Sequence, residues 1–285
     1  MEISHVLRAE EWLSSTPRPL MIYRALGFRP PKFGHLPMIL GPDRSKLSKR
    51  HGATSTLEYR ADGYLPEALS NFMALLGWSL DDKTDVMGIQ TMIDSFSLDR
   101  VVKSGAVFDH EKLDWMNGIY IRDLSPEDLS DRLIEYWEMF PPADLPQQID
   151  KSYLLQIVPL IQERIKTLKE ASARTQLFFK ETLDHEIPDL IQKGMDAENS
   201  LNALRHVEKA LESTDDFRAD RIEELLRKLV SDLSLSTRQL FGLTRVATTA
   251  SSISPPLPQT LEVLGKTRCL ARISEAVETI KQATD

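Results

Sequence analysis

Apolar residues recur at helical spacing along most of the chain. After Pro66, four apolar residues fall at i, i+3, i+4 and i+7, which predicts a helix that begins at Pro66 and ends just before Gly77. We therefore expect the chain to be all-α after residue 60. The apolar sets behind this prediction are Leu69, Phe72, Met73 and Leu76; Leu201, Leu204, Val207 and Leu211; Ile222, Leu225, Leu226 and Leu229; and Leu270, Ile273, Val277 and Ile280.

Prolines and hydroxyl residues mark several helix starts. Thr16-Pro17 predicts a helix that runs to about Gly27, because proline is tolerated in a first turn. The Ser-Pro-Glu-Asp segment at 125–128 combines a hydroxyl cap with a proline and two acids, and predicts another start. Thr267 is expected to cap the last helix. The pattern of 153–180 predicts a helix, in which Pro159 is expected either to break the helix or to start a new turn.

Three segments do not fit a helix. Residues 3–7 are interpreted as a short buried strand, a remnant of a parallel sheet. Three prolines within 141–146 remove backbone donors, so that stretch is predicted to be a linker. The Ser-Pro-Pro-Leu-Pro run at 254–258 is expected to form a rigid loop between helices.

Composition limits the class of protein. A length of 285 residues suggests about two domains, and 41% hydrophobic residues suffice for buried cores. Cys269 is the only cysteine, which excludes an intrachain disulfide and a cysteine-based zinc site; no metal ligands are predicted. No run of about 18 apolar residues and no signal-peptide pattern occur, so we expect a cytoplasmic protein without a membrane span.

Charge is unevenly distributed. The net charge of −8 argues against a diffuse basic coat. Residues 81–150 hold sixteen acids and six cations, a net −10, whereas residues 227–272 hold seven cations and two acids, a net +5. An acidic protein can bind RNA if its cations converge on one face. The alternative, that these cations lie on solvated helix faces pointing several ways, is equally compatible with the charges.

The pentapeptide Lys46-Leu47-Ser48-Lys49-Arg50 is the main candidate for chemistry. Two ammonium groups three residues apart, with a hydroxyl between them, can contact one polyphosphate, where charge-assisted donors stabilise newly formed negative charge. By itself the pattern is weak, because basic five-residue runs are common as solvated surface or nonspecific nucleic-acid patches.

The pentapeptide stands within a long series of ordered sequence blocks. They include Phe-Asp-His-Glu-Lys-Leu-Asp-Trp-Met-Asn-Gly at 108–118 and Glu-Arg-Ile-Lys-Thr-Leu-Lys at 163–169, together with 5–17, 35–43, 51–52, 58–59, 63–69, 75–78 and 261–266. In this order they resemble bacterial glutamyl-tRNA synthetases, which are class I aminoacyl-tRNA synthetases, from the late catalytic domain onward. The resemblance covers essentially the whole chain.

The resemblance implies a mainly α protein with a small α/β remnant of a Rossmann-type catalytic domain. The expected domains are this remnant at 1–45, the phosphate loop and a helical stem-contact domain at 46–125, and two helical anticodon-binding domains at 126–180 and 181–285. The early His-x-Gly-His signature of class I enzymes is missing, because all six histidines are isolated. We therefore expect the C-terminal portion of a synthetase, inactive in aminoacylation by itself.

The resemblance also implies which residues bind ATP and glutamate. Lys46, Ser48, Lys49 and Arg50 match the loop that closes over ATP, with Leu47 and Arg50 replacing the Met and Ser of the usual class I motif. Glu11 and Trp12 match residues near ATP, although Trp12 is equally compatible with a core position. Met38 and Ile39 match backbone contacts to adenine. Arg8 matches the glutamate pocket; its alternative is an ion pair with Glu10 or Glu11.

On the RNA side, the resemblance places Arg164 against the third anticodon base. Arg245 and the run 254–257 match the region that receives the first two bases, with Ser254, Pro255 and Leu257 as contacts. Lys112 falls in a block that meets the inner elbow of tRNA, whereas Phe108 and Trp115 of that block are expected in the core. The chain departs from the family at Ala250, where a glycine usually follows the Thr run.

The implied parent enzyme is a glutamate–tRNA ligase that uses ATP and Mg²⁺, with glutamate and tRNA(Glu) as partners, and it is expected to be a monomer. Two other functions remain open from the sequence. One is a stand-alone helical tRNA-binding module without catalysis. The other is a protein-interaction scaffold, which predicts no binding of tRNA at low salt.

Overall fold

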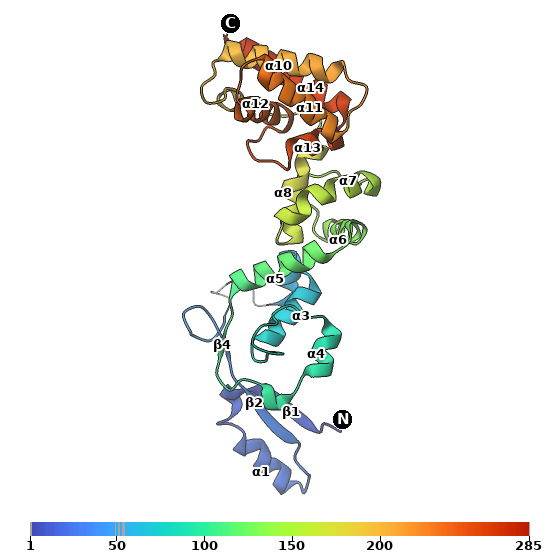
Figure 1. Ribbon diagram of the computed structural model, residues 1–285. Coiled ribbons are helices and arrows are strands. Elements are labelled where there is room, and N and C mark those ends of the chain that lie inside the picture. The colour runs from blue at the N-terminus through green and yellow to red at the C-terminus, as the bar shows by residue number, and fades with distance from the viewer. Residues whose placement is uncertain (1, 49, 51, 53–54, 285) are drawn as a thin grey trace. The chain divides into compact units, whose positions relative to one another are not determined.

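The computed structural model describes residues 2–48, 50, 52 and 55–284, with side chains up to 282. Within these residues the chain forms two compact units (Figure 1). The N-terminal unit comprises residues 1–123 with 166–168, and the C-terminal unit comprises 124–165 with 169–285. Helices predominate after residue 60, and the strands lie in the N-terminal unit, so the predicted fold class is confirmed. No helix in the described range is long and apolar enough to span a bilayer.

Two small parallel sheets form the first part of the N-terminal unit. Strand β1 (His5–Ala9) pairs with β2 (Lys32–Leu36), and β3 (Ile39–Leu40) pairs with β4 (Ala106–Val107). The predicted strand is present but begins two residues later than expected. It is also not buried, since Leu7 is 52% exposed. In the described residues β1 has β2 as its only neighbour, which leaves apolar side chains open.

A short 3₁₀ helix and one α-helix connect β1 to β2. They are η1 (Glu10–Trp12) and α1 (Pro17–Ala25). Helix α1 begins at Pro17 as predicted, because the proline ring fits a first turn. Thr16 does not cap it; its hydroxyl donates to the Trp12 carbonyl at 2.9 Å. The helix ends near Gly27, whose φ of +69° reverses the chain.

The remainder of the N-terminal unit is helical and holds an aromatic core. Its elements are α2 (Thr56–Ala61), α3 (Pro66–Leu75), α4 (Ile89–Ser95), η3 (Leu98–Arg100) and α5 (His110–Asp123). Helix α3 confirms the predicted start at Pro66. Tyr59, Phe72, Phe108, Leu113 and Met116 form one buried cluster.

Trp115 corrects an expectation for α5. It is 45% exposed, because its neighbours Met116 and Asn117 occupy the face of α5 that turns to the core. Asn117 accepts a hydrogen bond from the Leu65 amide at 2.8 Å and donates to the Lys166 carbonyl. Its side chain therefore fixes residue 166 against the N-terminal unit.

In its described part, the C-terminal unit consists of helices and the loops that connect them, without strands. Its elements are α6 (Pro126–Met139), α7 (Lys151–Ile161), η4 (Gln162–Arg164), α8 (Leu168–Phe179), α9 (Ile187–Leu190), α10 (Ala197–Glu212), α11 (Ala219–Asp232), α12 (Thr237–Thr249), α13 (Leu257–Leu264) and α14 (Lys266–Thr284). Ser125 caps α6 as predicted, accepting from the Asp128 amide at 3.1 Å. Residues 141–146 are non-helical, as expected for the proline-rich stretch.

Three boundaries differ from the predictions. Helix α7 continues through Pro159 and ends at Ile161. Helix α14 already begins at Lys266, so Thr267 lies inside its first turn; Gly265, with φ +80°, sets the start. The predicted loop at 254–258 ends at residue 256, since Leu257 and Pro258 open α13, where a proline is tolerated.

Candidate functional site

The predicted phosphate loop folds back onto β3. The Leu47 amide donates to the Ile39 carbonyl at 3.0 Å, and the Gly41 amide donates to the Ser45 carbonyl at 2.8 Å. Lys46 forms an isolated bridge with Leu40. Ser48 is partly buried, and Lys49 lies outside the described residues. The backbone thus presents the exposed Lys46 at the edge of the sheet.

Lys46 is paired with another predicted site residue. Its Nζ lies 2.6 Å from Glu11 Oε2, across 35 positions of sequence, and both side chains are exposed. Arg50 in turn contacts Asp43 Oδ2 at 3.1 Å and Ser45 Oγ at 2.7 Å. Exposed ion pairs contribute only about 0–1 kcal/mol. Either cation can therefore exchange its carboxylate for a phosphate at small cost.

Arg8, predicted to bind glutamate, projects from β1 into a polar cluster. Its Nε donates to His35 Nε2 at 3.3 Å and its Nη2 to Thr16 Oγ1 at 2.7 Å. The guanidinium also lies over the rings of Phe33 and Trp12, at 5.2 and 5.8 Å from their centroids. These contacts, rather than an ion pair with Glu10 or Glu11, orient it in the described structure. Trp12 is 50% exposed, so it is not a core residue.

Met38 and Ile39 present backbone groups at the same edge. The Met38 amide donates to Glu10 Oε1 at 3.4 Å, while the Ile39 carbonyl accepts from Leu47. The Ile39 side chain packs on the aromatic core. The two residues thus connect the loop to the core through β3.

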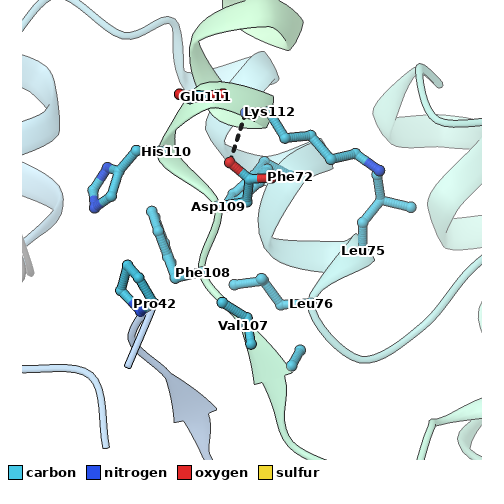
Figure 2. A pocket seen from close by; sticks show the side chains of 11 residues that line it. Pro42, Phe72, Leu75, Leu76, Val107, Phe108, Asp109, His110, Glu111 and Lys112 are labelled. Carbon is cyan, nitrogen blue, oxygen red and sulfur yellow. Dashed lines mark hydrogen bonds between the residues drawn. The ribbon is translucent and has the colours of Figure 1, made fainter. Parts of the chain in front are cut away.

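A cavity of about 550 Å³ lies beside β4 and the first turn of α5 (Figure 2). Its floor is apolar, with Phe72, Leu76 and Phe108, and its rim is polar. Lys112, a predicted RNA contact, stands on this rim. Its amide donates to Asp109 Oδ1 at 3.1 Å and its Nζ lies 2.9 Å from Asp85 Oδ1. Phe108 is buried at 2% exposure, which confirms its core prediction.

A second cavity, of about 620 Å³, lies within the C-terminal unit. We call it the arginine pocket. One wall is α8 with Lys180 directly after it, the other is the segment 249–255, and Arg164 of η4 also lines the cavity. The structure thus places the predicted residues Arg164, Ser254 and Pro255 on one cavity. Its lining residues are Arg164, Glu170, Ala173, Arg174, Gln176, Leu177, Lys180, Leu183, Thr249, Ala250, Ser251, Ile253, Ser254 and Pro255.

Two cations of the arginine pocket were not predicted. Arg174 lines it from α8, and Lys180 lines it from the position directly after that helix. A signal for them existed in the sequence, because Glu170, Arg174 and Leu177 recur at helical spacing only a few residues after Arg164. Their position on one helix face required the helix boundaries to be known.

Arg245 stabilises the 249–255 wall of the arginine pocket through hydrogen bonds. Its Nη1 donates to Ser254 Oγ at 2.9 Å and to the carbonyls of Ser254 and Pro255 at 3.2 Å each. Burial lowers the pKa of the Arg245 guanidinium, and the nearby charge of Arg164 lowers it further. Arg245 therefore fixes the shape of the segment that the resemblance assigned to RNA contact.

The other predicted contacts in this segment are largely buried. Ser254 is 8% exposed and Leu257 1%, and Pro255 is also buried. Ile253 is 71% exposed and was not predicted. The proline-rich run therefore shapes a backbone loop, and Ile253 is the large side chain that it presents to solvent.

Ala250 adopts the left-handed conformation after α12, with φ 50° and ψ 32°. Its amide donates to the Val246 carbonyl at 2.8 Å, which closes the helix. The resemblance leads us to expect glycine at this position, and an alanine in the left-handed conformation carries an energetic cost.

We expect Ala250→Gly to stabilise the C-terminal unit by about 1 kcal/mol, because the left-handed conformation costs glycine nothing sterically. Thermal unfolding measures the change, as a midpoint raised by about 2–4 °C. Ala247→Gly is the control: Ala247 is buried within α12, so that variant should be destabilised. A lowered midpoint for Ala250→Gly would contradict the assigned conformation.

The cations of residues 227–272 divide into two groups: Arg227, Lys228 and Arg238 are exposed on helices, whereas the other four bind backbone carbonyls. Lys266 Nζ donates to the carbonyls of Glu212 and Thr214, each at 2.7 Å. Arg245, Arg268 and Arg272 also donate to backbone carbonyls. Burial, followed by the neighbouring Arg268, lowers the pKa of Arg272. Much of the positive charge in this region is therefore used inside the unit.

Comparisons with known proteins show the family of both parts of the chain. Residues 1–115 match the family model of class I tRNA synthetases (E and Q), catalytic domain, and residues 128–277 match that of an anticodon binding domain. A glutamate–tRNA ligase of Dehalococcoides mccartyi is 48% identical over 282 residues, and one of Moorella thermoacetica is 38% identical over 284. Each alignment covers 99% of this chain.

A solved structure is similar as well. The crystal structure of a glutamate tRNA ligase from Elizabethkingia meningosepticum, in complex with its amino acid, superimposes with a TM-score of 0.81 at 29% identity. It covers 98% of this chain and 58% of that one. The chain likewise spans 58% of the length of the two ligases above. The chain therefore belongs to the glutamate–tRNA ligase family of class I synthetases, of which it spans part of the catalytic domain and the anticodon-binding domain.

Proposed function

We propose that this chain supplies the phosphate loop and the tRNA-binding half of a glutamate–tRNA ligase, and that it does not aminoacylate tRNA by itself. The observation that carries the proposal is the arginine pocket. It lies in the part of the chain that matches the anticodon-binding model, and it joins Arg164 to the segment 249–255.

The arginine pocket suits an unpaired base of tRNA(Glu). Single-stranded bases are read by side chains that stack on them or bond their edges, and a guanidinium does both. Arg164 is the proposed reader of the third anticodon base. Arg174 and Lys180 add positive charge on the α8 wall, where they can contact phosphates. The braced loop after Ala250 would receive the first two bases with little loss of entropy.

The loop of the N-terminal unit suits a triphosphate. Lys46 would leave Glu11 for an ATP phosphate, and Arg50 would leave Asp43. The Met38 amide, which donates to Glu10 Oε1, would leave that carboxylate for a backbone contact with adenine. Mg²⁺ bound to the triphosphate would neutralise part of its charge. Ser48 and Lys49 complete the proposed loop.

The proposed reaction has two steps. In the first, a carboxylate oxygen of glutamate attacks the α-phosphorus of ATP, the bond to the β-phosphate oxygen breaks, and pyrophosphate leaves. Lys46 would stabilise the charge that develops on the leaving oxygens. In the second, a terminal ribose hydroxyl of tRNA attacks the activated carbonyl, loses its proton and displaces AMP. Arg8 would hold the side-chain carboxylate of glutamate, which does not react, during both steps, since its guanidinium already binds polar groups.

The proposal is tested on the anticodon side by Arg164→Ala. We expect it to weaken binding of tRNA(Glu) by about 5- to 30-fold, because one base contact by a guanidinium contributes about 1–2 kcal/mol. A panel of tRNAs altered at the third anticodon base should lose its differences in affinity. The dependence of binding on salt should change little, since a base contact releases few counterions.

Arg221→Ala is the matched control. Arg221 is exposed on α11 and paired with Glu224 at 2.6 Å, outside the arginine pocket. It should leave the ranking of the panel unchanged. A uniform loss across all tRNAs in Arg164→Ala would contradict base reading. Absence of tRNA binding to the unmodified chain at low salt would favour an interaction scaffold.

A further inference from the structure

Arg272 is a charged residue in the core of the C-terminal unit. It lies on α14, its side chain is fully buried, and it is the largest of the fully buried side chains. It makes no ion pair at any described residue, and its Nε has no hydrogen-bond partner there. A buried charge of this kind is costly unless its remaining donors are well used.

The donors of Arg272 reach two different helix ends. Nη1 donates to the Thr248 carbonyl in the last turn of α12 at 2.7 Å. Nη2 donates to the carbonyls of Leu177 and Lys180, at the end of α8, at 2.9 and 2.6 Å. Terminal carbonyls lack partners within their own helix and carry the negative end of its dipole, so a cation satisfies both.

These two helix ends are the walls of the arginine pocket. Leu177 of α8 and Lys180, directly after α8, line it on one side, and Thr249, next to Thr248, lines it on the other. Arg272 itself is not among the lining residues. One rigid guanidinium thus joins the backbones of both walls from behind.

Arg268 provides a comparison from the same helix. Its Nη1 donates to the Phe178 carbonyl at 2.7 Å and to the Tyr153 hydroxyl at 2.9 Å. It therefore holds the end of α8, as Arg272 does, but its hydrogen bonds within the described residues go to α7 and α8 and none goes to α12. Arg272 therefore binds the backbones of both walls of the arginine pocket, whereas Arg268 binds only one of them.

We propose that Arg272 is a positioning residue for RNA recognition: it sets the spacing between the α8 wall and the α12 wall of the arginine pocket, and through it the ability of Arg164 to distinguish bases. The inference rests on the proposed function. A planar fork with donors on two nitrogens is needed, because a single ammonium cannot replace bonds that diverge to two walls. Arg272 acts without touching RNA.

The test compares Arg272→Lys with Arg268→Lys in the full chain. Affinities for tRNA(Glu) and for a transcript altered at the third anticodon base are measured for each, together with thermal unfolding. We expect Arg272→Lys to reduce the ratio of the two affinities by about tenfold, the scale of one lost base contact. Arg268→Lys should keep the ratio even if it lowers the unfolding midpoint equally.

Each outcome of this test supports or overturns the inference. An unchanged ratio in Arg272→Lys, or an equal loss in both variants, overturns the inference. Arg272→Gln, which also removes the buried charge, is the second variant; if neither variant folds, Arg272 serves folding and the proposal is overturned. A wild-type chain that does not discriminate between the transcripts overturns the proposed function itself, which is a distinguishable result.

Discussion

Arg245→Ala is expected to weaken tRNA(Glu) binding by about 10- to 100-fold. The variant removes the guanidinium, whose Nη1 donates to three oxygens: the Ser254 hydroxyl and the carbonyls of Ser254 and Pro255. Ser254 and Pro255 are both buried. Hydrogen bonds to charged groups contribute about 1.5–3 kcal/mol each, and buried acceptors left without a partner add a penalty. The loop must then be ordered at the moment of binding, so its entropy opposes association. Equilibrium titration with labelled tRNA measures the loss.

Ser254→Ala distinguishes the contribution of the Ser254 hydroxyl from that of the Arg245 guanidinium. It deletes one acceptor but keeps both carbonyls, so its effect on affinity should stay below about threefold. Arg245→Lys should fall between the two variants, because an ammonium can serve fewer of the acceptors. Should Arg245→Ala bind tRNA like the unmodified chain, the loop would not need its brace, and the segment 250–256 would lose its proposed role.

Phe108→Ala is expected to destabilise the N-terminal unit by about 3–5 kcal/mol, the usual loss for a buried phenylalanine. Its ring packs edge-on against Phe72 at 4.9 Å, stacks on Tyr59 at 5.8 Å, and lies 4.8 Å from His110. Its amide donates to the Leu40 carbonyl at 2.8 Å, at the base of the phosphate loop. Hydrogen exchange resolved by peptide measures the loss, which should appear in residues 2–123.

Trp115→Ala is the control for Phe108→Ala. It removes a larger aromatic side chain from the neighbouring helix α5, but one that is 45% exposed, so the loss should be smaller. Peptides from residues 169–282 should keep their protection in both variants, because their core is separate. Equal losses in both units would contradict the independence of the two cores.

Local sequence signals predicted the fold well. Pro66 and Ser125 start helices because their chemistry acts within one turn, and both starts are confirmed. Thr267 was assigned as a cap on residue type alone, whereas Gly265 sets the start through its backbone conformation. The prediction that residues 3–7 are buried was wrong, because the burial of a strand depends on neighbouring elements that its own sequence pattern does not reveal.

The candidate site was predicted less completely, for a physical reason. The residue types in the family motifs identified Lys46, Glu11 and Arg164, but not which side chain meets which. Burial of Ser254 and Leu257, and the inward direction of Arg268 and Arg272, depend on tertiary packing. A cation in a sequence can serve a phosphate or a carbonyl equally well, and only the structure distinguishes the two.

The use of cations on internal carbonyls has a consequence for encounters in solution. Arg245, Lys266, Arg268 and Arg272 donate to backbone carbonyls, so four of the seven cations of residues 227–272 are engaged inside the C-terminal unit of a chain whose net charge is −8. An acidic exterior repels polyanions in general, which suppresses unspecific adsorption of RNA. Nonspecific adsorption of RNA should therefore be weak, and attraction should be strong where exposed cations gather, as Arg164, Arg174 and Lys180 do at the arginine pocket.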